Sequence, residues 1–238
     1  MDALHRLVDA GVQVVACTGR PYPGALPWVE RLGLTAPIVC YQGAQVRELD
    51  GGMLLDHGVA HGLAMEVVRY AQERNLHVQA YRDDKLIVPR DRPEAHEYAE
   101  HASMKIHVVG DLDKAMGPTT PKLVIVSTPS TLEGLLPDAR ARWAGRLNVA
   151  TSTPDYLEFT SLESDKASAL RFLSDRFGVS RSEVAAAGDG RNDASMIAWA
   201  GLGVAVEGSP AEVLDAADRT IARPGGRGIV ELANILLS

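Results

Sequence analysis

The sequence predicts an α/β protein, with a parallel-sheet core interrupted by an inserted α+β domain. In both terminal parts of the chain, helices alternate with short, fully apolar strands, as in a parallel sheet covered on both faces. The strands of the middle part are more polar or alternate in polarity, which is typical of a sheet with one solvated face. We therefore expect a core formed by residues 1–50 and 154–238, and an inserted domain over residues 51–153.

The first part of the core is expected to contain two helices and two strands. Helical spacing of apolar residues distinguishes the helices, and continuous apolar runs of four to six residues distinguish the strands. In chain order these are the helix "ALHRLVDA", the strand "VQVVAC", the helix "ALPWVERLG" and the strand "PIVCY". The turn "TGRPYPG" precedes the second helix, and Pro23 is suited to its first turn.

The same alternation returns after residue 160. The expected helices there are "SDKASALRFLSDRFG", "NDASMIAWAG", "SPAEVLDAA" and "GIVELANILL". The expected strands between them are "EVAAAG", "LGVAV" and "RTIA". The expected strands of the inserted domain are "MLLDHGV", "HVQAYRDDKLIV", "KIHVVG", "KLVIVS" and "LNVATS", with the helix "GLAMEVVRYAQERN" among them.

Composition limits the partners of this protein. Of its 238 residues 46% are hydrophobic, and its net charge of -7 argues against a broad nucleic-acid-binding face. No apolar run approaches the roughly 18 residues that span a bilayer. Cys17 and Cys40 lie in apolar strand-like runs, where buried, reduced thiols are expected rather than a disulfide. We expect a cytoplasmic protein without nucleic-acid or membrane partners, and the sequence does not indicate its oligomeric state.

Polar residues follow the strands where a parallel sheet places its ligands, beyond the carboxyl ends. "TGR" comes directly after "VQVVAC", and "GDGRND" comes directly after "EVAAA". Lys166, in the first turn of a predicted helix, adds a compact positive charge suited to a phosphoryl group. Asp189 and Asp193 offer the oxygen ligands that Mg²⁺ prefers. Together these residues predict a metal-assisted phosphate site.

The segments "CTGRP", "SDKASAL" and "GDGRNDASMIAWAGLGVAV" resemble, in order and spacing, motifs II, III and IV of the haloacid dehalogenase-like (HAD) phosphatases. The match is closest to the Cof-type branch, which has a Rossmann-like core and an inserted type IIB cap. The resemblance covers nearly the whole chain, and motif IV is its most specific part. It implies that Thr18 and Gly19 bind the transferred phosphoryl group and that Lys166 stabilises its oxygens. Asn192 would orient the substrate phosphate or the metal carboxylates.

The resemblance also implies a cofactor, a substrate class and a route. Asp189 would coordinate Mg²⁺, and Asp193 would support the metal shell directly or through water. The implied activity is removal of phosphate from small phosphorylated metabolites, above all sugar phosphates, through an aspartyl-phosphate intermediate. Closure of the cap would exclude water and select the substrate.

The chain departs from the family pattern at two places. Gln42, in "YQGA", replaces an asparagine of the family's N-G-A segment. The family's nucleophile, the first Asp of D-x-D-G-T, has no counterpart, and the "DLD" at Asp111–Asp113 lies in the predicted cap, where we interpret it as a loop. Two explanations are open: the D-x-D strand precedes Met1 in a longer natural protein, or the chain is a non-catalytic pseudo-phosphatase that binds phosphometabolites. We favour the first because motifs II to IV are intact.

Other chemistries fit less well. A cysteine phosphatase would cradle a phosphate between Cys17 and Arg20, and two intervening residues are too few for that loop. The seven histidines lack the spacing of zinc ligands. The sequence leaves open whether Arg20 and Arg191 belong to the site or to the surface.

Overall fold

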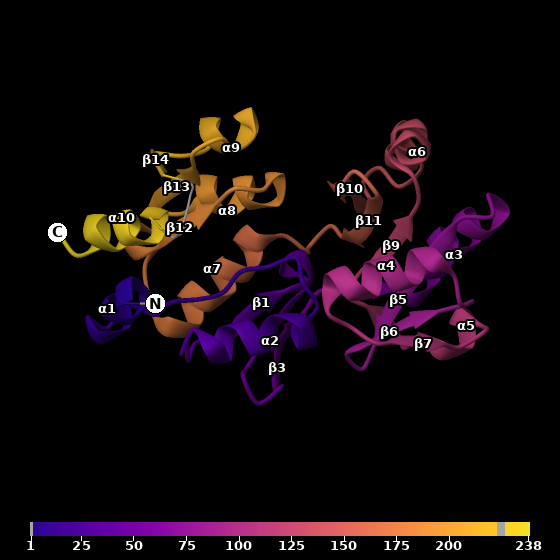
Figure 1. The fold of residues 1–238 in the computed structure, drawn as a ribbon, viewed down its shortest axis with the longest axis horizontal. Helices are drawn as coiled ribbons and strands as arrows, with labels where there is room; N and C mark the ends of the chain where they lie inside the picture. Colours follow the sequence, from indigo (N-terminus) through magenta and orange to yellow (C-terminus); the bar gives the residue numbers. More distant parts are fainter. Residues whose placement is uncertain (1, 223–226) are drawn as a thin grey trace.

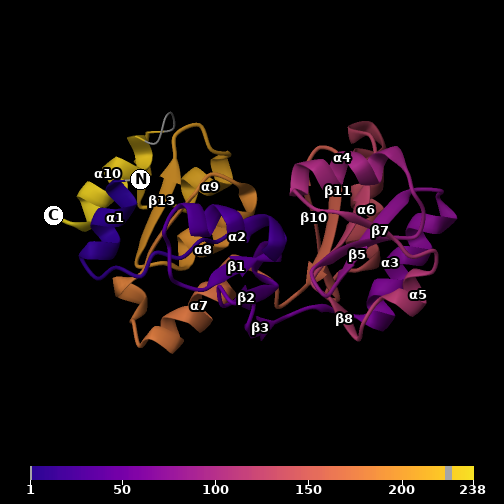
Figure 2. The same cartoon turned by 60° about the horizontal axis from the view of Figure 1, so that its bottom comes forward.

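The computed structural model describes residues 2–222 and 227–238. Two parts lie side by side in Figure 1: a core built from both terminal portions of the chain, and a cap built from its middle. Figure 2 shows the same two parts from another side, with extended segments passing between them. The predicted architecture, an α/β core with an inserted α+β domain, is confirmed.

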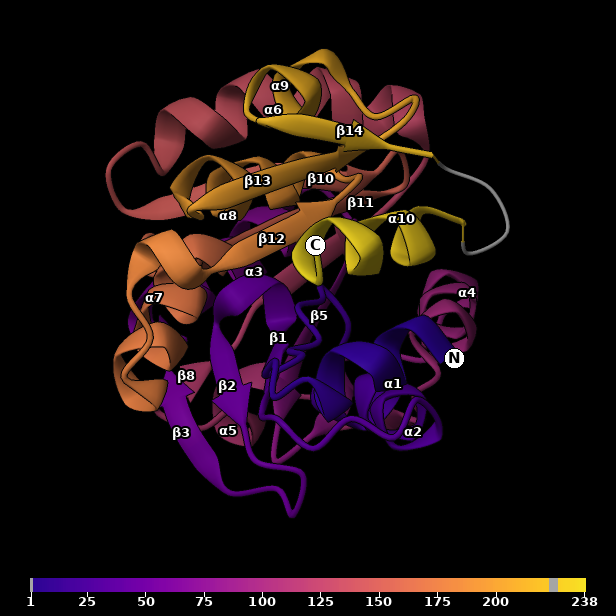
Figure 3. The same ribbon diagram turned by 90° about the vertical axis from the view of Figure 1, so that its left-hand side faces the viewer.

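The core contains two small sheets. The strands β12, β13 and β14 form a parallel sheet in that order, and β1, β2 and β3 form an antiparallel one. The parallel sheet consists of β12 (Ala185–Gly188), β13 (Leu202–Val206) and β14 (Arg219–Ile221). The antiparallel sheet consists of β1 (Ile38–Cys40), β2 (Gln45–Arg47) and β3 (Met53–Asp56). Figure 3 shows the parallel sheet above the antiparallel one, with α7 beside both.

Helices surround these sheets where the apolar periodicity predicts them. The α-helices are α1 (Asp2–Asp9), α2 (Tyr22–Arg31), α7 (Lys166–Phe177), α8 (Ala194–Trp199), α9 (Ala211–Asp215) and α10 (Arg227–Leu236). Three short 3₁₀ turns join them: η1 (Tyr41–Gly43), η2 (Arg181–Glu183) and η3 (Arg191–Asp193). Pro23 lies in the first turn of α2, as expected.

The strand predicted for "VQVVAC" is not formed. Cys17 makes a single parallel bridge to Val39, supported by hydrogen bonds from Thr18 N–H to Val39 O (2.8 Å) and from Val39 N–H to Ala16 O (2.9 Å). A β-strand needs several consecutive residues paired with a neighbouring strand. Here the segment pairs with β1 only around Cys17 and Val39, on one of its two sides. Within the described residues, β12 likewise pairs only with β13. Both segments are mostly half-buried, although their sequences are those of central strands.

The cap is built on a six-stranded sheet with strand order β10-β11-β9-β5-β6-β7. Its strands are β5 (His77–Arg82), β6 (Lys85–Val88), β7 (Ile106–Val108), β9 (Leu123–Val126), β10 (Leu147–Thr153) and β11 (Tyr156–Ser161). The short strands β4 (Val59–Ala60) and β8 (Thr119–Thr120) pair beside it. The cap helices are α3 (His61–Glu73), α4 (Pro93–Ala102), α5 (Leu112–Ala115) and α6 (Pro129–Arg142).

Each predicted domain boundary falls between two strands that pair with each other. The boundary at residue 153 separates β10 from β11, but these two strands form one antiparallel pair, so the cap sheet continues to Ser161. The boundary at residue 50 falls in the turn between β2 and β3, which pair with each other. Local composition does not show which strands pair, and it is the pairing partners that decide to which sheet a strand belongs.

The cap has a hydrophobic core of its own. Trp143 is fully buried and packs edge-on against Tyr70 (5.0 Å between ring centroids) and Phe159 (5.1 Å). Burial of such aromatic side chains stabilises the cap independently of its contacts with the core. Among the described residues, every helix is too short or too polar to cross a bilayer.

Candidate active site

Lys166 is placed by the first turn of α7. The Asp165 side chain caps this helix, since its Oδ1 accepts hydrogen bonds from the N–H groups of Ala167 (2.7 Å) and Ser168 (3.2 Å). Lys166 is 4% exposed, and its Nζ donates a 2.5 Å hydrogen bond to Oδ1 of Asp193. A local capping signal thus brings a buried ammonium group to the end of β12.

The "GDGRND" loop folds around the Asp193 carboxylate. Oδ2 of Asp193 accepts hydrogen bonds from the backbone N–H groups of Asp189 (3.1 Å) and Gly190 (2.9 Å), while Oδ1 accepts from Lys166. Asp193 is 6% exposed, whereas Asp189 is exposed at the tip of the loop. Both oxygens of Asp193 therefore hold the loop and the lysine in place.

The turn of η1 packs directly against the Thr18–Gly19 segment. The N–H of Gln42 donates to Thr18 O (3.3 Å), and a Cβ on Gly19 would lie 2.5 Å from the Gln42 amide nitrogen. Gly43 has φ +92°, and a Cβ there would lie 2.3 Å from the carbonyl oxygen of Asp165. Only glycine permits this close approach, so η1 is held between the Thr18–Gly19 segment and the start of α7.

Gln42, the departure from the family pattern, joins core and cap. Its Oε1 accepts a hydrogen bond from Nδ2 of Asn192, and its Nε2 donates to Oε2 of Glu158 on β11 (3.2 Å). One side-chain amide therefore connects the "GDGRND" loop with a cap strand.

The cap contributes a buried ion pair that the sequence did not predict as part of the site. Nζ of Lys122, at the start of the β9 segment, donates to Oε1 of Glu158 (2.8 Å) and to the carbonyl oxygen of Gly19 (3.3 Å). Ser152 also donates to Oε1 of Glu158 (2.9 Å). Burial opposes the charged form of Lys122, but the Glu158 carboxylate outweighs it, so the pKa of Lys122 lies above its usual value. Charged residues within apolar strand runs, "PKLVIV" and "YLEF", were the available signal.

The predicted site residues are thus linked by direct contacts. Thr18, Gly19, Asn192, Asp193 and Lys166 share one network through Gln42 and the loop backbone. The two arginines differ: Arg20 donates to the carbonyl of His101 in the cap (3.3 Å), whereas the exposed Arg191 pairs with Glu212 (3.3 Å).

The "DLD" segment lies away from these residues, in the cap. Asp111 accepts a hydrogen bond from Asp113 N–H (3.0 Å) and so caps the short helix α5. The segment therefore begins a short helix where the sequence suggested a loop, and the Asp111 carboxylate serves as the cap of that helix.

The donor set limits how a metal ion would be held. Within residues 2–222 and 227–238, no group of three or more His, Cys, Asp or Glu side chains could hold a metal ion. Mg²⁺ commonly takes one or two carboxylates and completes its shell with water and substrate phosphate. Asp189, exposed at the loop tip, offers one such carboxylate, whereas both oxygens of Asp193 accept hydrogen bonds from Lys166 and the loop backbone, so Asp193 would support the metal shell through the loop rather than with a free carboxylate.

Cys17, beside Thr18, is expected to be unreactive. Burial raises the pKa of its thiol to about 12, with Lys166 opposing this rise and Asp193 and Asp165 adding to it. At pH 8 the thiolate fraction is then about one in ten thousand, so alkylation by iodoacetamide should be about a thousandfold slower than in urea. Mass spectrometry of the alkylated peptides measures both rates, and equal rates would contradict the assignment. Both cysteines are free thiols, as expected, although only Cys40 is fully buried.

An α/β core with an inserted cap and a buried lysine–aspartate pair at the end of a parallel strand is the arrangement expected of a haloacid dehalogenase-like phosphatase. Comparison with known proteins supports the same family. Residues 1–232 match the model of the haloacid dehalogenase-like hydrolases, and the chain belongs to this family. It is 28% identical over 204 residues to the HMP-PP phosphatase of Serratia proteamaculans, covering 86% of this chain and 74% of that one.

Solved structures show the same fold. A haloacid dehalogenase-like hydrolase from Bacteroides thetaiotaomicron is 26% identical, with a TM-score of 0.88, covering 99% of this chain and 90% of that one. The sugar phosphatase BT4131, of HAD subclass IIB, superimposes with a TM-score of 0.82 at 17% identity, covering 98% of this chain and 89% of that one. The predicted Cof-type, type IIB resemblance is confirmed.

Proposed function

We propose that this protein is a Mg²⁺-dependent phosphatase of small phosphorylated metabolites, with sugar phosphates as the preferred class. The observation that carries the proposal is the buried Lys166–Asp193 pair at the end of a parallel strand, joined through the loop and Gln42 to Thr18 and Gly19. Two free thiols support a reducing, cytoplasmic setting. The net charge of -7 supports small-molecule rather than nucleic-acid partners.

Each residue has a defined task in this proposal. The Thr18 hydroxyl and the Gly19 N–H bind and orient the phosphoryl oxygens, and the Lys166 ammonium offsets their charge in a buried setting where electrostatic interactions are strong. Asp193 positions Lys166 through a direct hydrogen bond. Asn192, held by Gln42, orients the substrate phosphate from the other side of the loop.

Asp189, supported by Asp193, would hold the Mg²⁺ ion. Such an ion supplies charge stabilisation for the transferred phosphoryl group. The backbone hydrogen bonds to Asp193 keep the loop in the shape that presents Asp189. The cap pair Lys122–Glu158 closes over Gly19, and so supports a role of the cap in selecting the substrate.

The aspartyl-phosphate route needs a nucleophile, and we propose that a D-x-D-G-T strand outside these 238 residues supplies it. The place proposed for this strand is between residues 12–17 and β12. Two observations support that place: each segment lacks a strand partner on one side among the described residues, and each is mostly half-buried despite an apolar sequence. Unpaired strand edges favour the addition of a strand.

The second candidate function is binding of phosphometabolites without turnover, which the absence of D-x-D-G-T from the 238 residues favours. This alternative predicts that the chain binds phosphate or a sugar phosphate and never hydrolyses it. Removing a covalent nucleophile commonly leaves only residual catalysis.

The two candidates are separated by adding the strand. We expect a protein extended at its N-terminus by a D-x-D-G-T strand to hydrolyse p-nitrophenyl phosphate in Mg²⁺ at least about a thousandfold faster than the 238-residue chain. The matched control carries Asn in place of the first Asp of that strand, and chelation of Mg²⁺ should abolish the activity. A folded, extended protein without activity would refute the phosphatase proposal and leave the binding function.

A further inference from the structure

Gln42 lies in a backbone conformation that few long side chains adopt. Its φ is +64° and that of Tyr41 is +52°, so two successive residues other than glycine lie in the left-handed region. The core holds this backbone in place: the N–H of Tyr41 donates to Arg20 O (3.0 Å), and the N–H of Gln42 donates to Thr18 O (3.3 Å). Because residues in this region persist only where their surroundings hold them, such a turn beside a site suggests a function for the side chains that it presents.

The turn directs both of these side chains towards the cap. Tyr41 is fully buried, and its ring packs edge-on against Tyr81 of β5 (5.2 Å between ring centroids). The Gln42 amide lies over Gly19, since a Cβ on Gly19 would lie 2.5 Å from Nε2 and 2.9 Å from Oε1 of Gln42. The amide is therefore placed between the backbone of the phosphate site and the cap.

The length of the Gln42 side chain allows it to contact both parts at once. Nε2 donates to Oε2 of Glu158 on β11 (3.2 Å), and Oε1 accepts from Nδ2 of Asn192 in the "GDGRND" loop. Asparagine, which the family pattern has at this position, would withdraw the amide by one C–C bond, about 1.5 Å. An amide withdrawn so far would no longer lie within hydrogen-bond distance of both partners.

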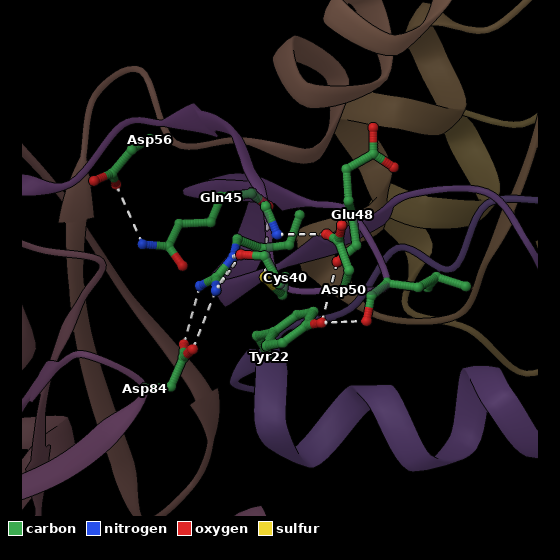
Figure 4. A network of polar contacts seen from close by, with 11 residues as sticks. Tyr22, Cys40, Gln45, Glu48, Asp50, Asp56 and Asp84 are labelled. Atoms are coloured by element: carbon green, nitrogen blue, oxygen red, sulfur yellow. Dashed lines mark hydrogen bonds and ion pairs between the residues drawn. The ribbon is translucent and has the colours of Figure 1, made fainter.

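A second contact between core and cap lies away from this turn. Arg47 of β2 donates two hydrogen bonds, of 3.1 and 3.2 Å, to the carboxylate of Asp84, between β5 and β6. In Figure 4 the Asp84 carboxylate faces the core hairpin, with Tyr22 of α2 nearby. Because this pair does not involve Gln42, loss of the Gln42 contacts should shift the cap without releasing it.

We propose that Gln42 is a positioning residue that holds β11 of the cap and the "GDGRND" loop in one arrangement. Its amide fixes the side chain of Asn192 and, through Glu158, the position of the cap over Gly19. Order in the loop and the position of the cap therefore change together. The task of Asn192 in orienting a phosphate rests on the proposed function, but the link itself does not depend on catalysis.

Two variants with opposite backbone preferences test this link. Gln42→Asn suits the left-handed backbone but shortens the side chain, whereas Gln42→Met keeps the length and lacks the amide. Both should move the cap away from the core, although Gln42→Asn should unfold at a higher urea concentration than Gln42→Met. If the side chain served stability alone, the position of the cap would instead follow the stability of each variant.

Double electron–electron resonance measures the position of the cap between two spin labels. The labels are attached to Glu30→Cys in α2 and Glu133→Cys in α6, which are exposed positions of core and cap. Cys40 is buried, and burial raises the pKa of Cys17 to about 12, so the introduced thiols react first. We expect the distance distribution of both Gln42 variants to be shifted to longer distances and broadened.

Hydrogen exchange measures the order of the loop in the same variants. The backbone N–H groups of Asp189 and Gly190 donate to Asp193, next to the residue that Gln42 holds. Loss of that contact should make exchange in the peptide covering residues 185–193 about fivefold faster or more.

Asn75→Gln is the matched control. Asn75 is an exposed residue of the cap with φ +53°, so this change is the reverse substitution at a left-handed position away from the core. It should lower stability but leave the distance between the labels and the exchange of residues 185–193 unchanged.

Three results would overturn the proposal: an unchanged distance in Gln42→Asn, unchanged exchange in the loop, or an equal shift in Asn75→Gln. If Gln42→Met fails to fold, Gln42→Asn decides alone, because its backbone is favoured. These measurements use no substrate, so an inactive protein would refute the phosphatase proposal and leave the role of Gln42 intact.

Discussion

Replacement of Lys166 by methionine is expected to lower the free energy of unfolding by about 3–5 kcal/mol. The side chains of Lys166 and Asp193 are 5% and 8% exposed, and their charged atoms are 2.5 Å apart. Methionine keeps most of the volume but leaves the Asp193 carboxylate buried without its counter-ion. The same change should abolish measurable binding of inorganic phosphate. Urea titration measures the stability change and calorimetry the binding.

The matched control for Lys166→Met is Lys114→Met. Lys114 pairs with Asp111 at 3.2 Å, but the two side chains are 86% and 49% exposed. An exposed pair of this kind contributes little to stability, because water screens both charges. If Lys166→Met lowered the free energy of unfolding no more than Lys114→Met does, the Lys166–Asp193 pair would not hold the "GDGRND" loop in place.

Replacement of Lys122 by methionine is expected to have a comparable effect in the cap, again about 3–5 kcal/mol. Lys122 and Glu158 are 2% and 8% exposed at their side chains and lie 2.8 Å apart. Loss of the ammonium group leaves a buried carboxylate and also removes the contact to the carbonyl of Gly19 (3.3 Å). The variant should therefore also loosen the contact between cap and core, measured as faster proteolysis of the segments that join them.

Arg146→Met is the matched control within the cap. Arg146 pairs with Glu66 at 2.7 Å, and the side chains are 45% and 30% exposed. Although this pair is as short as the buried one, water screens its charges, so Arg146→Met is expected to lower the free energy of unfolding much less than Lys122→Met does. Equal losses for Lys122→Met and Arg146→Met would show that burial of the Lys122–Glu158 pair has no energetic consequence.

These two buried pairs belong to one connected arrangement. Asn192, next to Asp193, donates to Gln42, and Gln42 donates to Glu158, the partner of Lys122. A displacement of the cap therefore changes the hydrogen bonds of the loop that presents Asp189. This gives a physical basis for coupling between cap closure and the geometry of the phosphate site.

The sequence alone determined the elements that local signals encode. Helical periodicity predicts α7 with Lys166 in its first turn, and the short apolar run "EVAAAG" predicts β12. The positions of "TGR", Lys166 and "GDGRND" after strands or at a helix start predict a phosphate site, because strand ends of a parallel sheet converge at one edge. The helices and strands themselves depend on residues close to each other in the chain.

Only the tertiary structure decided the features that depend on distant partners. The "VQVVAC" segment has the composition of a strand but lacks the pairing to form one, and β11 belongs to the cap because β10 and β9 flank it. Gln42 finds Asn192 150 positions away, and Lys122 finds Gly19 103 positions away. Such contacts leave no periodic signal in the sequence, since burial of a single charged residue depends on which distant group compensates it.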